Sequence, residues 1–190
     1  MIIRSSGFEI DGFYIPPFEL NKGELLNLII FSGGHFFDLE RKLRVIFSGK
    51  QKQEQILIDQ PLQFVENFYD FNYRRFLIPI TVQKFLNKSA NIEQIDKIDI
   101  WKDFNYSKTT KLITIPNYDR RLLALISALS NSKNLMFDLT GIDPKNAISF
   151  LKKIKKITND GGSAIFINNF DDETENGFCD KRVVIQQIKN

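Results

Sequence analysis

The sequence LMFDLTGIDP, residues 135–144, decides how the rest of the chain is interpreted. Its apolar start, which closes on Asp138, is typical of a parallel strand that is buried on both faces and carries an acid to the edge of a sheet. Such an acid often holds the metal ion of a phosphate site, and in hydrolytic sites a second acid follows it to polarise water. Here the next residue is Leu139. The stretch therefore predicts the scaffold of a catalytic strand without its catalytic carboxylate.

A strand, a glycine turn and a helix are predicted earlier in the chain. The apolar run at residues 25–31 is continuous, which indicates another strand buried on both faces, and Gly33 and Gly34 break it. Apolar residues then recur at the spacing of one helix face, as Phe36, Phe37, Leu39, Leu43, Ile46 and Phe47. This order of elements holds a phosphate group at the helix N-terminus in many nucleotide-binding proteins.

The same patterns place the other elements. Short β segments are expected before residue 25, with further strands at residues 56–58, 62–65, 134–138, 163–167 and 182–188. Helices are expected at residues 82–86, 92–100 and 116–130, and from residue 144 to the glycines at 161–162. This alternation predicts an α/β fold with a mostly parallel sheet flanked by helices. An N-terminal antiparallel β subregion and a small helical insert at about residues 80–130 complete residues 1–190, which we interpret as a single domain.

Composition sets modest bounds on function. The chain has 190 residues, 43% of them hydrophobic and 26% charged, which suits a globular core that needs neither disulfides nor metal. A net charge of +3 is too small to require nucleic acid or a membrane as partner. With Cys179 as the only cysteine and His35 as the only histidine, a disulfide and a zinc site are both implausible. Lacking a signal-like or membrane-length apolar run, the chain is expected to be cytoplasmic and to reach a membrane only through a partner.

Five short segments match the motifs of one family in order and spacing. They are FELNKGE at residues 18–24, PITVQKFL at 79–86, RLLALISAL at 121–129, DLTGIDP at 138–144, and GGS at 161–163 with CDKRV at 179–183. In these segments the chain resembles the ATP-binding cassette (ABC) ATPases, the motor domains of ABC transporters. The segments correspond to the turn before the phosphate-binding strand, the entry to the helical subdomain, the helix after the signature motif, Walker B with the D-loop, and the closing strands. The resemblance spans nearly the whole chain and implies a P-loop NTPase fold.

At the phosphate-binding loop the resemblance fails. The family pattern is glycine, four residues, glycine, lysine, then serine or threonine, because the lysine neutralises the phosphates and the hydroxyl holds magnesium. We aligned this chain with the family pattern by its Ser48 and Gly49. In that alignment Gly34 stands at the position of the first glycine, Glu40 at the position of the lysine, and Arg41 at the position of the serine or threonine. One charge pair at about 4 Å and an effective dielectric of roughly 20 is worth on the order of 4 kcal/mol. Replacing attraction by repulsion therefore predicts that no nucleotide binds specifically.

The other site positions of the family have changed as well. The residues at these vestigial positions are Asn67 for the Q-loop glutamine, Pro116, Asn117 and Tyr118 for the signature motif, Leu139 for the catalytic glutamate, Asp143 in a shortened D-loop, and Asn169 for the switch histidine. The one histidine, His35, lies in a different region, so the switch histidine is absent. Among these changes Asp138 is interpreted as a structural remnant rather than a metal ligand.

These losses predict a catalytically inactive ABC ATPase-like domain, a pseudo-ATPase without catalytic residues, cofactor or metal, that serves as a structural or interaction subunit. The resemblance implies a protein partner: a homodimer mate, an active ABC ATPase or a membrane permease. One alternative is an ATP-binding subunit with a non-standard site that retains Asp138. The other is a nucleic-acid-binding protein, which would use aromatic and basic residues at 68–76 or a basic helix face. That face comprises Lys145, Lys152, Lys153, Lys155 and Lys156, although a solvated helix face explains it better, because Leu151, Ile154 and Ile157 account for the spacing as core contacts.

Overall fold

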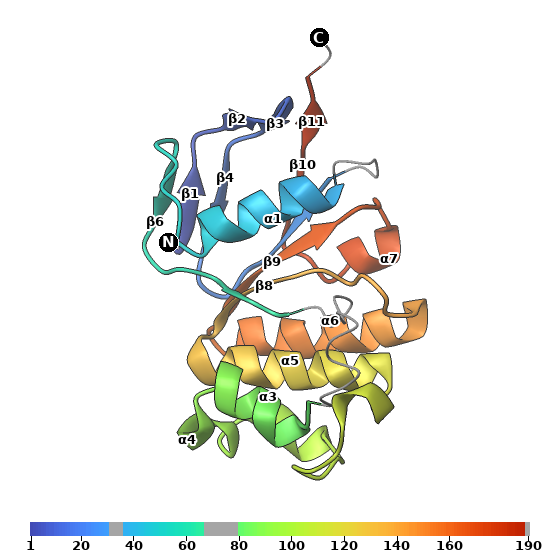
Figure 1. Ribbon diagram of the computed structural model, residues 1–190. Coiled ribbons are helices and arrows are strands. Elements are labelled where there is room, and N and C mark those ends of the chain that lie inside the picture. Colours follow the sequence, from blue (N-terminus) through green and yellow to red (C-terminus); the bar gives the residue numbers. More distant parts are fainter. Residues whose placement is uncertain (31–35, 67–79, 189–190) are drawn as a thin grey trace.

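A parallel sheet forms the centre of the computed structural model, which describes residues 1–30, 36–66 and 80–188 (Figure 1). Within those residues its strand order is β10-β5-β9-β8-β7, and every neighbouring pair is parallel. The strands are β5 (Leu25–Ile29), β7 (Gln63–Phe64), β8 (Asn134–Phe137), β9 (Ser163–Asn168) and β10 (Lys181–Val184). All residues of β5, β8 and β9 are buried, as their mostly apolar sequences predict.

The two faces of the sheet are covered by different elements. On one face the side chains of Leu28, Met136 and Ile165 pack against α1 (Phe36–Phe47) and the N-terminal strands. On the other face Phe137 and Phe166 stack with their ring centroids 5.1 Å apart, and they pack with residues of α5 (Asn117–Asn131) and α6 (Pro144–Asn159). Figure 1 shows α1 above the sheet and α5 and α6 below it. The strands are therefore buried on both sides.

Two small antiparallel sheets lie beside α1. One has the order β4-β1-β6 and consists of β1 (Ile3–Ser5), β4 (Phe18–Leu20) and β6 (Ile56–Ile58). The other has the order β11-β3-β2 and consists of β2 (Phe8–Ile10), β3 (Phe13–Ile15) and β11 (Gln186–Gln187). The two residues between β2 and β3 are Asp11 and Gly12, both with positive φ, which is the turn that Asp-Gly favours between paired strands.

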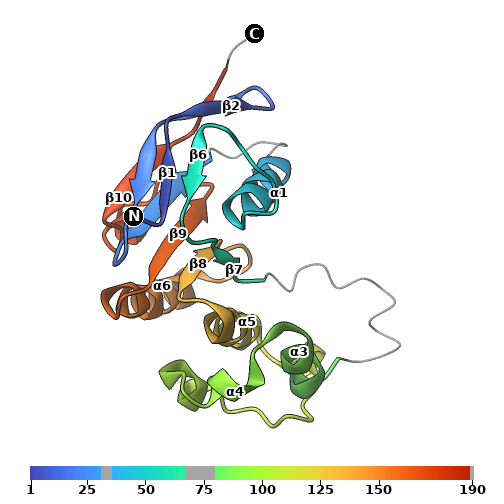
Figure 2. The same ribbon diagram turned by 90° about the vertical axis from the view of Figure 1, so that its left-hand side faces the viewer.

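A layer of short helices packs against the far side of α5. It contains α3 (Val82–Ser89), α4 (Ile92–Ile95) and the 3-10 helices Asp99–Asp103 and Leu112–Thr114. Leu123 and Ile126 of α5 face this layer, whereas Leu122 and Leu125 belong to the cluster under the sheet. Helix α5 has apolar residues on both sides, and it therefore joins the apolar cluster under the sheet to the apolar cluster of the short helices (Figure 2). None of the helices in the described residues is both long and apolar enough to cross a membrane.

The observed elements confirm the α/β fold class and correct several local predictions. The helix predicted at residues 92–100 ends after Ile95, and the strand predicted at 182–188 divides into β10 and β11 at Ile185. The strand expected at 62–65 covers only Gln63–Phe64. Phe37, assigned to the apolar face of its helix, is instead 61% exposed. A short helix, α7 (Glu173–Asn176), was not predicted; its cap is Asp172, whose carboxylate accepts bonds from two backbone N–H groups.

Candidate functional site

The candidate site lies where β5 and β8 end and α1 begins. In parallel α/β sheets, ligands bind outside the carboxyl ends of the strands, and helix N-termini favour anions. Asp138 follows β8 directly and is 1% exposed. Gly34 and His35 fall outside the described residues, so α1 is described from Phe36 onward.

The first turn of α1 carries no cation. Phe36 is buried, Phe37 is exposed, and their rings meet edge to face with centroids 5.2 Å apart. Asp38 is the charged residue of this turn, and its carboxylate lies 2.5 Å from the guanidinium of Arg41. The positive end of the helix dipole would attract a phosphate, but here it already interacts with the carboxylate of Asp38.

The register inferred for the phosphate-binding loop is wrong for this helix. We placed Glu40 and Arg41 at the lysine and hydroxyl positions, which belong at the helix N-terminus. Because α1 begins at Phe36, Glu40 lies in its second turn. The error arose because the register was anchored on Ser48 and Gly49, beyond the end of the helix, and not on the strand before it. The lysine is nevertheless missing, since the sequence has none between Lys22 and Lys42.

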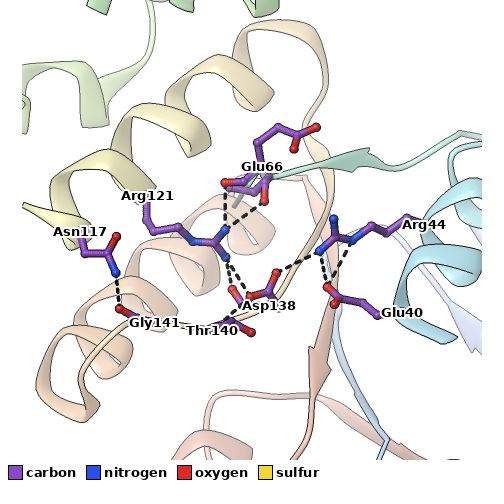
Figure 3. Close-up of polar contacts among 9 residues, drawn as sticks. Glu40, Arg44, Glu66, Asn117, Arg121, Asp138, Thr140 and Gly141 are labelled. Atoms are coloured by element: carbon purple, nitrogen blue, oxygen red, sulfur yellow. Dashed lines mark hydrogen bonds and ion pairs between the residues drawn. The ribbon is translucent and has the colours of Figure 1, made fainter. Parts of the chain in front are cut away.

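Glu40 faces the interior and is part of a buried charge network (Figure 3). Its carboxylate is 2.5 Å from a guanidinium nitrogen of Arg44, one helical turn later. Arg44 Nη2 also lies 3.4 Å from Asp138 Oδ2. Glu40 is 2% exposed, and its burial, followed by the charge of Asp138, raises its pKa to about 7.

Arg121 of α5 completes this network from the opposite side of Asp138. It is 2% exposed, and it donates hydrogen bonds to the backbone carbonyls of Asp138, Val65 (3.3 Å) and Glu66 (2.9 Å). Its Nη2 is also 3.6 Å from Asp138 Oδ1, which accepts a 2.7 Å bond from Thr140 N–H. We call Glu40, Arg44, Arg121 and Asp138 the charge network; it joins α1, α5 and the ends of β7 and β8 (Figure 3).

The charge network balances two guanidiniums against two carboxylates. A buried charge is tolerated when it is paired and its remaining polar atoms are hydrogen-bonded. Asp138 meets both conditions, since each of its carboxylate oxygens faces a guanidinium and one also accepts a backbone bond. In the part of the chain that the structure describes, no cluster of three His, Cys, Asp or Glu side chains could hold a metal ion.

The residues after Asp138 have structural contacts. Leu139 is half-buried and packs on the apolar cluster between the sheet and α5 and α6. Asp143 is the N-cap of α6: its carboxylate accepts bonds from the backbone N–H (3.1 Å) and side-chain amide (2.6 Å) of Asn146. These hydrogen bonds lower the pKa of Asp143. The segment predicted as a shortened D-loop is thus a turn that leads into a capped helix.

At the position of the signature motif, the start of α5 is attached to this turn. Pro116 is the exposed residue before the helix. The side-chain amide of Asn117 donates a 2.6 Å bond to the carbonyl of Gly141. Tyr118 is half-buried and packs on the same apolar cluster as Leu139. Asn117 therefore connects the start of α5 to the segment that follows Asp138.

The remaining vestigial positions lie apart from the charge network or outside the description. Asn169 follows β9 in a bend and is half-buried. Its neighbour Asn168 donates a 2.7 Å bond to the carboxylate of Glu175 in α7. Asn67, proposed for the Q-loop position, and the aromatic stretch at residues 68–76 fall outside the described residues.

Three of the five lysines on the basic face of α6 have aspartate partners. Lys153 lies 2.5 Å from Asp103 and Lys155 lies 2.6 Å from Asp180. Lys156 is 3.5 Å from Asp99. Paired ammonium groups release few counterions from nucleic acid, so this face gives little support to the nucleic-acid alternative.

Sequence reasoning did not identify the two arginines of the charge network. Arg121 was noted only as the first residue of a helix motif, and Arg44 was not singled out. One signal was available: Arg44 stands four residues after Glu40, a spacing that places oppositely charged side chains on the same side of a helix. The contact between Arg44 and Asp138 could not be inferred, because it joins residues far apart in the chain.

Comparison with known proteins shows similarity in structure and not in sequence. No protein-family model matches the chain, and no curated protein matches it. The structure resembles cbiO1 from Clostridium perfringens, part of the ABC transporter complex cbiONQ, with a TM-score of 0.71 at 15% identity, over 98% of this chain and 85% of that one. It also resembles MJ1267, an ATP-binding cassette of an ABC transporter, with a TM-score of 0.74 at 13% identity, over 98% and 88% of the two chains. A nucleotide-free ATP-binding cassette from an ABC transporter has a TM-score of 0.68 at 12% identity, over 98% and 88%. The chain therefore has the fold of an ABC ATPase domain.

Proposed function

We propose that this chain, which has the ATP-binding cassette fold, is a catalytically inactive ABC ATPase-like subunit that works through protein contacts. The observation that carries the proposal is the pairing of Asp138 with two arginines, Arg44 at 3.4 Å and Arg121 at 3.6 Å. In the family that the sequence resembles, the corresponding aspartate serves the metal ion of the nucleotide site. Here guanidinium groups take the place of the metal charge.

Binding of magnesium at Asp138 would be costly in this arrangement. The ion would have to displace Arg44 and Arg121 from the carboxylate. Arg121 is 2% exposed and would keep its charge in the interior with less compensation. Removing one partner of a buried ion pair costs about 3–5 kcal/mol, so the charge network opposes metal binding.

The phosphate and water positions support the same proposal. The first turn of α1 presents the exposed ring of Phe37 and the carboxylate of Asp38, so a phosphate there would meet an apolar ring and a negative charge. At the position of the water-polarising acid, Leu139 is packed against other apolar side chains. An apolar side chain cannot act as a general base. We therefore propose that the site has no catalytic residue, cofactor or metal.

The proposed role is that of a structural or interaction subunit. The similar protein cbiO1 is part of an ABC transporter complex, which supports a protein partner for this chain. We propose a homodimer mate, an active ABC ATPase or a membrane permease as that partner, and a cytoplasmic location peripheral to the membrane. Direct binding of nucleic acid is not part of the proposal, because aspartates pair with three of the lysines of α6.

A titration with labelled ATP and magnesium tests the proposal. We expect no saturable binding up to about 1 mM, which corresponds to a binding free energy weaker than about 4 kcal/mol. An intact ABC ATPase measured under the same conditions is the positive control. Micromolar binding would overturn the proposal and favour the alternative, an ATP-binding subunit with a non-standard site.

The variant Asp138→Asn also distinguishes the inactive subunit from an ATP-binding subunit with a non-standard site. If Asp138 held magnesium, the substitution would weaken magnesium-dependent ATP binding while the metal-free binding remained. Under our proposal it leaves nucleotide binding absent and lowers the stability of the fold. A hydrolysis assay on the same samples then reports whether any ATPase activity depends on this carboxylate.

A further inference from the structure

A groove of about 530 Å³ runs beside β7, at one edge of the parallel sheet. Figure 2 shows β7 at the margin of the sheet, with α1 above it and α5 below it. The lining comes from α1 and the loop after it, from β7, and from the end of α5, and it includes Arg41, Arg44, Lys50, Phe64, Glu66 and Ser132. We call this feature the edge groove. Arg44 belongs to both the edge groove and the charge network.

One wall of the edge groove is cationic. Arg41, Arg44 and Lys50 line it, against Glu66 as the acidic lining residue among those described. Arg41 is paired with Asp38, but both side chains are more than 60% exposed, and such a surface pair is weak enough to exchange partners. Lys50 is exposed, and the described residues give it no ion pair. Arg41 and Lys50 can therefore meet negative charge from outside.

Arg44 gives this wall a fixed shape. Its guanidinium carbon lies 3.4 Å from the centroid of the Phe64 ring, and Glu40 holds the same group from behind. A side chain held on two sides loses little conformational freedom when a ligand approaches. The wall is thus ordered before anything binds.

The strand at the base of the groove has an open side. Val65 N–H donates a 2.8 Å bond to the carbonyl of Met136 in β8. Successive residues of a strand direct their backbone groups to opposite sides in the plane of a parallel sheet, so the N–H and C=O of Phe64 face away from β8. Nothing in the described part of the chain bonds to them. The N–H of Leu62, on the same side, donates to Phe47 O at 3.0 Å, which leaves the carbonyl of Leu62 for a ligand.

We propose that the edge groove binds an extended acidic segment of a partner protein. The segment lies along β7 as an added strand, bonds to the backbone of Phe64 and Leu62, and directs its carboxylates toward Arg41 and Lys50. The open backbone groups specify a peptide, because an added strand supplies the matching N–H and C=O groups. The cationic wall specifies acidic side chains. The edge groove shares Arg44 with the charge network, but binding of a peptide to it needs no ATP and can be measured without nucleotide.

Fluorescence anisotropy with a short labelled peptide that alternates glutamate with threonine tests the proposal. We expect saturable binding that weakens as salt is added. The peptide in which glutamine replaces glutamate should bind more weakly, and so should the acidic peptide with a central proline, which cannot complete the backbone ladder. The double variant Arg41→Glu with Lys50→Glu should bind about tenfold more weakly than the native chain.

Two controls make the result specific. Lys88→Glu changes an exposed lysine on α3, away from the edge groove, and should leave peptide binding unchanged. Hydrogen exchange should show slower exchange of the Phe64 amide in the complex, because that N–H becomes bonded. The proposal is overturned if the acidic peptide does not bind, if the proline peptide binds equally well, or if the groove variant matches Lys88→Glu. It is also overturned if single-stranded oligothymidine binds the groove more tightly than the peptide does.

Discussion

Replacing Arg121 with methionine tests whether the charge network holds the fold together. Arg121 is 2% exposed and donates to three backbone carbonyls besides facing Asp138. Methionine fills much of the same volume, so a cavity contributes little. The substitution leaves the carbonyls without their donor and Asp138 with one guanidinium. Breaking a buried pair of this kind costs about 3–5 kcal/mol.

The expected result is a loss of about 4 kcal/mol in the free energy of unfolding, measured by urea denaturation followed by circular dichroism. With an unfolding entropy of about 2.1 cal/mol/K per residue, such a loss lowers the Tm of a chain of this length by about 10 °C. Arg41→Met is the matched control, because Arg41 is exposed, and it should cost less than about 0.5 kcal/mol.

A double-mutant cycle that combines Arg121→Met with Asp138→Asn tests whether Asp138 is the partner of Arg121. Each substitution removes the same contact. The double variant should therefore lose about 1–3 kcal/mol less stability than the sum of the losses in the two single variants. Our reasoning is refuted if Arg121→Met costs no more than Arg41→Met, or if the cycle shows no coupling. In either case Arg121 would not be the group that stabilises the buried carboxylate of Asp138.

Further predictions concern Glu40, Cys179 and Gly162. The pKa of Glu40 is raised to about 7, so the folded state holds the proton more tightly than the unfolded state, and stability falls as the pH rises from about 4.5 to 7. Relative to Glu40→Gln, the native chain should lose about 3 kcal/mol over this range in urea titrations; parallel profiles would contradict the assignment. Burial raises the pKa of Cys179 to about 12, so maleimide should label it slowly at pH 8 in the folded chain and rapidly in urea, and rapid labelling of the folded chain would argue against a buried thiol. In Gly162→Ala the new Cβ would lie 2.6 Å from the backbone carbonyl of Lys133, so thermal melts should show a clear drop in Tm; Gly177→Ala, with its closest contact at 3.4 Å, is the control that should change Tm little.

The central sheet and its main helices could be predicted because their signals are local. The run from Leu25 is apolar except for Asn27, and the run from Leu135 to Phe137 is apolar throughout; such sequences are typical of strands that are covered on both faces. Asp143 and Pro144 mark the start of α6 as cap and first helical residue, and the apolar stripe then continues to Ile154. Capping and periodicity need no knowledge of distant residues.

The charge network could not be predicted, because its contacts are long-range. Arg44, Arg121 and Asp138 come from α1, α5 and the end of β8, and their pairing depends on how these elements pack. The short helix α7 was missed although its cap, Asp172, is a local signal, because its four residues are too few and too polar to show an apolar periodicity. The side chain of Asn176, the last residue of α7, accepts a 2.6 Å hydrogen bond from the side chain of Asn27 in β5. The local sequence does not predict this contact. The register of Glu40 was wrong because the motif that would have anchored it is missing.

The strand order has a consequence for the synthesis of the chain. β5 is made early, yet its two neighbours are β9 and β10, which are made last. While the ribosome builds the residues between them, the apolar side chains of β5 have no strand beside them. Pairings that must wait for distant segments form slowly and leave apolar surface open to aggregation. A nascent chain halted before Ser163 should therefore be a strong substrate for chaperones, whereas one released after Val184 can close the sheet on both sides of β5.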